Sequence, residues 1–316
     1  MTRWIEETFH PHWRVRLMAD KVLHEVKTEH QHLVIFENAT WGRVLMLDGV
    51  CQLTTSDEFV YHEMMAHVPL MALAKPKRVL VVGGGDGGVM REVLKHPSIE
   101  KATLCEIDRS VVDLSLEHYP EIAGGALDDP RCDLVIADGL KYVAGTKEKF
   151  DAIIVDSSEP IGPSAVLHTP EFFADCKRAL RDGGILVTQN GLPFLFPDHL
   201  AGTTRAFATL FRRVAPYMCT QPCYFGGPFA LNWASDDASH VDISEKKLGR
   251  RREKRGIATR YWTPAVHNAA FALPAYAQGV VDAAIADATK KVTRKAKGPA
   301  KKAVKPRAKG RVARKG

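Results

Sequence analysis

No apolar run in this 316-residue sequence approaches the roughly 20 residues that a membrane-spanning helix needs. The opening segment, residues 1–7, lacks the apolar stretch of a signal peptide. The six cysteines are scattered, and no second pair of ligands stands at zinc spacing from Cys219 and Cys223. These absences argue against membrane, secreted and zinc-stabilised proteins, and they predict a cytoplasmic protein with free thiols.

The histidines predict no metal site either. Three close pairs have no third ligand at a suitable spacing: His10/His12, His30/His32 and His62/His67. The first two pairs are spaced as on one side of a strand. The third pair is five residues apart, so its members do not share a helix face. Solvated or pocket-lining histidines are the simpler interpretation.

Acidic residues are missing from residues 290–316, which contain 13 Lys or Arg. Residues 1–289 hold the remaining 31 bases against all 37 acids, so the overall charge of +7 conceals a body of net charge −6. An acidic body attracts small cations, and a basic tail attracts polyanions. The tail therefore predicts non-specific polyanion binding, with a merely solubilising extension as the alternative.

The chain is long enough for one large domain and a smaller one. Strand-like runs with a hairpin signal at Asp48-Gly49 come first: residues 33–36, 43–47 and 50–54. A helical pattern then begins near Ser56 and leads up to Pro69. The expected division is an N-terminal β domain over residues 1–55, a catalytic domain over 56–282 and a disordered Lys/Arg-rich tail over 283–316.

Short apolar strands alternate with helical stretches in the second part: 79–82, 102–107, 134–137, 152–155 and 185–188, with a later strand at 229–234. Such a pattern predicts an α/β fold with a doubly wound parallel sheet covered on both faces. One helix start is clearly marked, with Thr169 as N-cap, Pro170 at the first helical position and Glu171 in the first turn.

The segment Gly83 to Gly88 is a glycine-rich loop of the form G-x-G-x-x-G between a strand and a helix. Glu106 ends the next strand at the distance expected for a carboxylate that binds ribose hydroxyls. Asp138-Gly139 ends the third strand, where a carboxylate can accept from an adenine amino group. These three strand ends predict an adenosine-containing ligand. The alternative is a plain structural turn with surface acids.

Asp86, inside the glycine loop, indicates which adenosine-containing ligand binds. A pyrophosphate or the carboxylate of S-adenosylmethionine would meet a like charge there, at a cost of roughly 4 kcal/mol for charges about 4 Å apart. An adenosine ligand that ends in a bare ammonium would be attracted instead, as in decarboxylated S-adenosylmethionine. The alternative is that Asp86 caps the following helix.

Asp156 follows the fourth strand and opens the segment Asp156-Ser157-Ser158-Glu159, which is rich in carboxylates and is followed by Pro160. Ligands of doubly wound sheets lie at the carboxyl ends of strands, so Asp156 should reach the cleft. Such a loop suits a cationic amine, and Asp156 can take the proton that the amine loses before it attacks. A solvated Asx-type turn is the alternative.

Several of these segments resemble the signature segments of spermidine synthases, closest to the bacterial enzymes. They are residues 57–64, 83–88, 105–108, 156–163 and 261–267 continuing to 274, within a similarity that spans about residues 4–280. The resemblance implies a Rossmann-like, methyltransferase-type catalytic domain, a small N-terminal β domain and a homodimer or homotetramer assembled partly through the N-terminal strands.

The resemblance also assigns roles to matching residues. The aminopropyl donor would be held by Gln31, Asp86, Glu106, Asp138 and Gly139, with Pro163 beside the adenine. The amine would be bound by Tyr61, His62, Asp86, Asp156, Ser157, Ser158 and Glu159, with Tyr224 and Trp233 as pocket walls. Asp156 would accept the proton. Glu159 departs from the family, which usually has aspartate there, and this leaves the choice of amine open.

The predicted reaction transfers the aminopropyl group of decarboxylated S-adenosylmethionine, a co-substrate, to putrescine. It gives spermidine and 5′-methylthioadenosine, and it needs no metal or other cofactor. Three rival functions are a methyltransferase on the same fold, a nucleic-acid-associated protein with a vestigial enzyme body, and an NAD-dependent dehydrogenase. Asp86 and the amine-type loop argue against the methyltransferase, and the complete set of Asp86, Glu106, Asp138 and Asp156 argues against a vestigial enzyme. The dehydrogenase is disfavoured because its pyrophosphate would meet Asp86.

Overall fold

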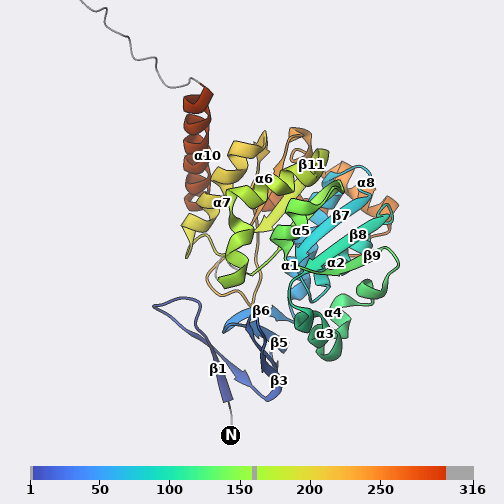
Figure 1. Ribbon diagram of the computed structural model, residues 1–316, viewed down its shortest axis with the longest axis vertical. Helices are drawn as coiled ribbons and strands as arrows, with labels where there is room; N and C mark the ends of the chain where they lie inside the picture. The colour runs from blue at the N-terminus through green and yellow to red at the C-terminus, as the bar shows by residue number, and fades with distance from the viewer. Residues whose placement is uncertain (1–2, 159–161, 297–316) are drawn as a thin grey trace, which may run out of the picture.

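The computed structural model describes residues 3–158 and 162–296. Antiparallel strands come first in the chain and form two small sheets. β1 (Arg3–Glu7) pairs with β2 (Val15–Ala19), and a four-stranded sheet has the order β3 (Lys21–Lys27), β4 (His32–Asn38), β5 (Gly42–Leu47), β6 (Val50–Thr54). Figure 1 shows these strands together, below the larger part of the molecule.

The three strands expected from sequence in this region are confirmed as β4, β5 and β6. The turn between β5 and β6 also follows the hairpin signal, since Asp48 and Gly49 both have positive φ, 48° and 76°. Strands β1, β2 and β3 were not predicted from sequence. Their side chains are largely exposed or half-buried, so apolar runs do not mark them.

A larger, eight-stranded sheet follows, in the order β12-β14-β11-β10-β7-β8-β9 with β13 paired to β14. Strands β7 to β11 are parallel, and β14 is antiparallel to its neighbours. The bounds are β7 Arg78–Gly83, β8 Lys101–Glu106, β9 Cys132–Ile136, β10 Phe150–Asp156, β11 Leu180–Gln189, β12 Arg213–Val214, β13 Tyr217–Cys219 and β14 Phe229–Ser235. The predicted doubly wound parallel sheet is confirmed, with an antiparallel edge.

Helices cover both faces of this sheet, because alternate strand residues point to opposite sides. In β7, Val79 and Val81 pack toward α1, α2, α8 and α9, while Leu80 and Val82 pack toward α5, α6 and α7. The helix bounds are α1 Glu58–Ala72, α2 Gly88–Leu94, α3 Arg109–His118, α4 Pro120–Ala123, α5 Gly139–Gly145, α6 Pro170–Ala179, α7 Pro197–Leu210, α8 Glu245–Arg255, α9 Pro264–Ala270 and α10 Ala275–Ala296. Short 3-10 turns are η1 Ala126–Asp128, η2 Gly162–His168 and η3 Ala238–His240.

Helix α1 continues through Pro69 to Ala72. A proline inside a helix removes one backbone hydrogen bond and strains the preceding turn. All residues of α1 except Phe59 are buried, so tertiary packing outweighs that cost. The start of α6 matches its sequence signal, since the Thr169 side chain accepts from the backbone N–H of Phe172.

Helix α10 corrects the expectation that residues 283–316 are disordered, because it extends to Ala296. Its buried residues Ala277, Val281, Ala284 and Ala288 recur every three or four positions. The helix lies alongside α7 (Figure 1). Small apolar residues at this spacing form a helical stripe that the Lys/Ala composition of the segment conceals. The rest of the predicted tail, 297–316, lies outside the described residues.

Within the described ranges, no single helix is long and apolar enough to cross a membrane. The bent pair of α9 with residues 275–291 of α10 meets that test by length and composition only.

Candidate active site

A cavity of about 350 Å³ lies between the N-terminal strands and the carboxyl ends of β7, β8 and β10. Its walls come from the N-terminal sheet, the first turns of α1, the glycine loop after β7, the carboxyl ends of β8 to β11, the turn η2 and the region from Gln221 to Phe229. This is where a doubly wound sheet places its ligands. Most of the residues predicted from sequence to form a site are brought together here.

The glycine loop approaches Asp156 closely. Gly83 pairs in register with Asp156, and a β-carbon on Gly84 would lie 2.5 Å from the Asp156 Oδ2 atom. Both glycines have positive φ, 81° and 73°, which other residues adopt at a cost. Glycine therefore lets the loop between β7 and α2 lie directly against the carboxylate that ends β10.

Asp86 combines the two roles that its sequence left as alternatives. Its Oδ1 atom accepts from the backbone N–H of Gly88 at 2.7 Å, at the start of α2, and its side chain also lines the cavity. The carboxylate is thus fixed by the helix terminus while it faces the ligand space. Because Asp86 lies 3.5 Å from the imidazole Nε2 of His62, a neighbouring cation reduces the repulsion that Asp86 alone would exert on an anion.

Four further residues predicted to hold a donor line the other end of the cavity: Gln31, Glu106, Asp138 and Gly139. The Gln31 amide donates to Asp108 at 3.2 Å, so the N-terminal domain is held against the end of β8. Asp138 accepts from the N–H groups of Leu140 and Lys141 and caps α5.

Glu106 is buried at the end of β8. Burial raises the pKa of Glu106 to about 7, although the N–H groups of Asp108 and Ile107 lower it. A carboxyl group poised in this way can accept or donate a hydrogen bond near neutral pH.

Asp156 occupies the centre of the site. Its Oδ1 accepts from the Tyr61 hydroxyl at 2.7 Å, while its buried Oδ2 finds no hydrogen-bond partner among residues 3–158 and 162–296. Burial and then the charge of Asp86 raise the pKa of Asp156 to about 6, against the opposing effects of His62 and Tyr61. A buried carboxylate oxygen of this kind is suited to receive a proton or an ammonium.

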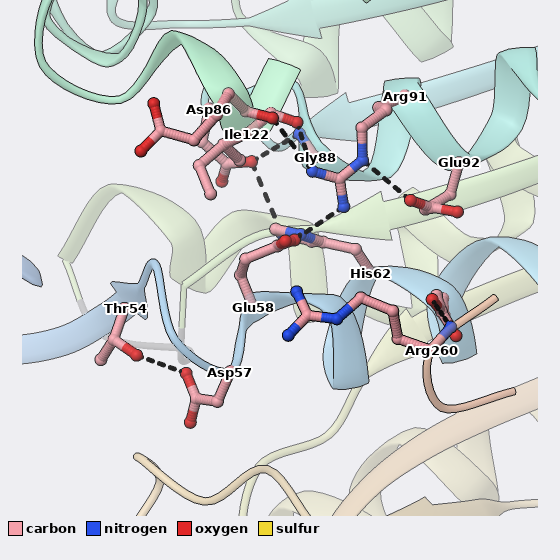
Figure 2. Close-up of polar contacts among 12 residues, drawn as sticks. Thr54, Asp57, Glu58, His62, Asp86, Gly88, Arg91, Glu92, Ile122 and Arg260 are labelled. Atoms are coloured by element: carbon pink, nitrogen blue, oxygen red, sulfur yellow. Dashed lines mark hydrogen bonds and ion pairs between the residues drawn. The ribbon is translucent and has the colours of Figure 1, made fainter. Parts of the chain in front are cut away.

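His62 lies between carboxylates (Figure 2). Its Nδ1 is 2.6 Å from Oε2 of Glu58, and its Nε2 faces Asp86. Burial opposes the charge of the imidazolium, but Asp86, Glu58 and Asp156 outweigh it and raise the pKa of His62 to about 9. His62 is therefore a fixed cation inside an acidic cleft.

The part of the cavity beyond Asp156 is walled by aromatic rings. Tyr61, Tyr224 and Phe229 contact one another with centroid separations between 4.9 and 6.1 Å. Ser157 and Ser158 also line the cavity, and the Ser157 hydroxyl lies 3.2 Å from the His168 imidazole. These rings and hydroxyls provide an apolar channel with polar edges, as an alkyl amine requires.

Trp233 does not line the cavity, contrary to the expectation from the resemblance. It is 1% exposed and belongs to the hydrophobic core on β14. The cavity is reached by Phe229, at the start of the same strand, and Trp233 lies four residues, or roughly 13 Å, further along it. Two other expected residues give no test: Glu159 lies outside the described residues, and of Pro163 only the backbone is described, in η2.

Glu58, Gln189 and Gln221 are among the cavity residues that were not predicted from sequence. Glu58 had a usable signal, since it stands four positions before His62 on a helix. Gln189 ends β11, so the rule that located Asp156 would have found it too. Gln221 is in a loop and had no such signal.

No group of three or more His, Cys, Asp or Glu side chains within the described ranges is arranged to hold a metal ion. The six cysteines are unpaired.

Comparisons with known proteins agree with this geometry. Residues 3–55 match the family described as the spermidine synthase tetramerisation domain, and residues 58–245 match the spermine/spermidine synthase domain. A polyamine aminopropyltransferase of Ruegeria sp. is 49% identical over 273 residues, 86% of this chain and 96% of that protein. Polyamine aminopropyltransferase 1 of Pseudomonas aeruginosa is 49% identical over 271 residues, 86% and 95% of the two chains.

Solved structures show the same relationship. A spermidine synthase in complex with the transition state analogue AdoDATO superposes with a TM-score of 0.84 at 34% identity, over 90% of this chain and 97% of that one. The spermidine synthase of Thermotoga maritima gives 0.81 at 33% identity, over 89% and 96%. Both parts of this chain match domains of the spermidine synthase family, and the chain spans nearly the full length of these relatives. It therefore belongs to the spermidine synthase family.

Proposed function

We propose that this chain is a polyamine aminopropyltransferase that transfers the aminopropyl group of decarboxylated S-adenosylmethionine to putrescine, giving spermidine and 5′-methylthioadenosine. One observation carries the proposal: Asp86 and Asp156 face a single cavity from the ends of neighbouring strands β7 and β10. Two carboxylates at this position suit a donor and an acceptor that are both cations. The activity named for the similar bacterial proteins supports the same reaction.

The donor lies across the carboxyl ends of β7, β8 and β9 in this proposal. Its ribose hydroxyls bond to Glu106, and Asp138 and Gly139 lie by its adenine, with Pro163 on the adenine side. Gln31 closes the donor end from the N-terminal domain, and Asp86 pairs with the terminal ammonium of the donor. The fixed position of Asp86 against Gly88 supports this last role.

The amine lies beyond Asp156, beside the rings of Tyr61 and Tyr224. His62, Ser157, Ser158 and Glu159 complete the polar edge of this pocket in the proposal. Putrescine is an apolar chain with a charge at each end. Aromatic walls with acidic groups near the reacting end match both of its features.

Asp156 accepts the proton in the reaction. A protonated amine has no free electron pair, so one ammonium proton first passes to the Asp156 carboxylate. The nitrogen then attacks the aminopropyl carbon, the carbon–sulfur bond breaks, and its electron pair neutralises the sulfonium to a thioether. Alignment of the two bound substrates supplies the largest share of the rate. The donor is a co-substrate, and the proposal includes no metal or other cofactor.

The experiment incubates the purified protein with decarboxylated S-adenosylmethionine and a panel of amines, namely putrescine, cadaverine, agmatine and spermidine. Mass spectrometry then identifies the products. A gain of one aminopropyl group on putrescine, with release of methylthioadenosine, supports the proposal. A parallel reaction with S-adenosylmethionine tests the methyltransferase alternative, and methylated products with no aminopropyl transfer would overturn the proposal.

Three further expectations belong with this function. Assembly into a homodimer or homotetramer is supported by the match of residues 3–55 to a tetramerisation domain. A cytoplasmic location is supported by the six unpaired cysteines. Non-specific polyanion binding by residues 290–316 is supported by their charge alone. Binding to a DNA column tests polyanion binding by the tail. Salt-sensitive retention that disappears when residues 290–316 are deleted would support it, and retention that is unchanged by the deletion would exclude it.

A further inference from the structure

Each ring nitrogen of His62 faces a carboxylate, and this arrangement favours the positively charged form of the ring. Nδ1 lies 2.6 Å from Glu58 Oε2, and Nε2 lies 3.5 Å from Asp86 Oδ1. A neutral imidazole has only one N–H group, so its other nitrogen would turn a lone pair toward one of the two carboxylates. Only the imidazolium makes both contacts favourable.

The position of the His62 ring is restricted by the backbone of α2. A β-carbon on Gly88 would lie between 2.1 and 2.7 Å from three atoms of the ring, so the imidazole rests directly on this residue. The N–H of the same Gly88 donates to Asp86. His62, Gly88 and Asp86 therefore form one unit at the mouth of the glycine loop.

Glu58 also connects this unit to Arg91 of α2 (Figure 2). Its Oε2 also accepts from Nη2 of Arg91 at 2.8 Å. The Arg91 guanidinium is fixed in turn by the Ile122 carbonyl at 2.7 Å and by Glu92 at 2.8 Å. Since three separate partners hold Arg91, Glu58 has a defined place from which to orient His62.

We propose that Glu58 is a positioning residue for the transfer reaction: it orients His62 as an imidazolium, and His62 in turn holds Asp86 toward the donor. This inference rests on the proposed function. The charged and titratable groups facing His62 are Glu58 and Tyr61 from α1, Asp86 from the glycine loop and Asp156 after β10, with Arg91 behind Glu58. Glu58, Asp86 and Asp156 carry three negative charges, and the His62 imidazolium and Arg91 carry two positive charges. The group therefore has a net charge of −1, which attracts cationic substrates.

The deciding variant is Glu58→Gln, which keeps the shape of the side chain and removes its charge. Nitrogen chemical shifts of the His62 imidazole report its protonation without any turnover. In the unmodified protein the ring should be doubly protonated at pH 7, and in the variant its titration should move to lower pH by about one pH unit or more. A neutral His62 at pH 7 in the unmodified protein would overturn the proposal even if the variant does not fold.

Kinetics provide the second measurement. If transfer requires the His62 imidazolium, kcat/KM should fall as pH rises through the His62 pKa of about 9, and this basic limb should move down by about one pH unit in Glu58→Gln. Glu58→Asp keeps the charge and should leave the limb close to its original pH. Glu121→Gln is the matched control, because Glu121 is exposed and pairs with Arg43 at 3.4 Å. A limb that stays in place in Glu58→Gln would contradict the proposal.

A double variant separates action through His62 from independent action. If Glu58 works through His62, then Glu58→Gln combined with His62→Gln should lose no more activity than His62→Gln alone. Losses that multiply would show that Glu58 acts by another route. Absence of aminopropyl transfer by the unmodified protein would instead contradict the proposed function, while the His62 titration would still test the role of Glu58.

Discussion

The Tyr61 hydroxyl donates a 2.7 Å hydrogen bond to Oδ1 of Asp156, and this bond leaves Oδ2 as the oxygen available to a substrate. Tyr61 comes from α1 and Asp156 from the end of β10, so the helix that follows the N-terminal domain orients the proposed base. The geometry makes the two oxygens of one carboxylate unequal. The first prediction therefore concerns Asp156 itself.

Asp156→Asn should keep the fold and lower turnover by roughly 10²- to 10⁴-fold, because the amide cannot accept the proton of the amine. Tyr61 can still donate to the amide oxygen, so the orientation of the side chain is preserved. Single-turnover rates with putrescine, together with circular dichroism, check the result. Near-normal turnover in a folded variant would remove Asp156 from the role of proton acceptor.

The acid limb of activity should reflect the raised pKa of Asp156. Since the deprotonated form is the active one, kcat/KM should fall as pH drops through about 6, the pKa of Asp156 in the folded protein. A pH series with putrescine measures this limb. Loss of the limb in the residual activity of Asp156→Asn would assign it, whereas an unchanged limb in that variant would assign it to another group.

Stability should show the opposite trend. An aspartate whose folded pKa is raised binds protons more tightly in the folded state, so its contribution to the free energy of unfolding becomes less favourable as pH rises from about 4 to about 6. Asp156→Asn should therefore have a higher Tm than the unmodified protein at pH 8, and the gap should close near pH 4. Thermal unfolding at the two pH values checks this, and a gap that widens on acidification would contradict it.

Much of the site was predictable because its residues stand at the ends of apolar strands. Asp86, Glu106, Asp138 and Asp156 all follow strands that the sequence marks clearly, and parallel strands bring their ends to one edge. Trp233 was misplaced because a residue in mid-strand has no such marker. The contacts that join His62, Glu58 and Arg91 could not be predicted from sequence. Arg91 is on another helix, and local spacing cannot relate it to α1.

Asp86→Asn should weaken binding of the decarboxylated donor and reduce the preference over S-adenosylmethionine. Asp86 attracts a terminal ammonium and repels a carboxylate. Removing its charge therefore weakens binding of the decarboxylated donor and strengthens binding of S-adenosylmethionine, so the two affinities become more alike. Because His62 lies 3.5 Å away and offsets part of the charge, we expect a change in the affinity ratio of about tenfold. Calorimetric titration with the two nucleotides measures the ratio. Equal affinities in the unmodified protein would defeat the electrostatic argument.

Gly88→Ala should lower activity without unfolding the protein. The added β-carbon would lie 2.1 Å from Cε1 of His62, so the imidazole must leave its place between Glu58 and Asp86. The matched control is Gly279→Ala in α10, where a β-carbon meets no described atom within 4 Å and alanine should stabilise the helix by roughly 0.5–1 kcal/mol. Enzyme assays and the imidazole spectrum of His62 check both variants. An unmoved His62 in active Gly88→Ala would show that the ring tolerates the contact.

Removal of residues 283–316 and removal of residues 297–316 should affect stability differently, because only the first removes packed residues of α10. Ala284 and Ala288 are 2% and 0% exposed, and the helix that carries them lies along α7. The longer deletion exposes the apolar face of α7 and should lower Tm by several degrees, roughly 2–4 °C for each kcal/mol lost. The shorter deletion removes no residue of α10 and should leave Tm within about 1 °C. Differential scanning calorimetry of the two proteins decides the matter, and equal Tm values would mean that the second half of α10 adds nothing to the fold.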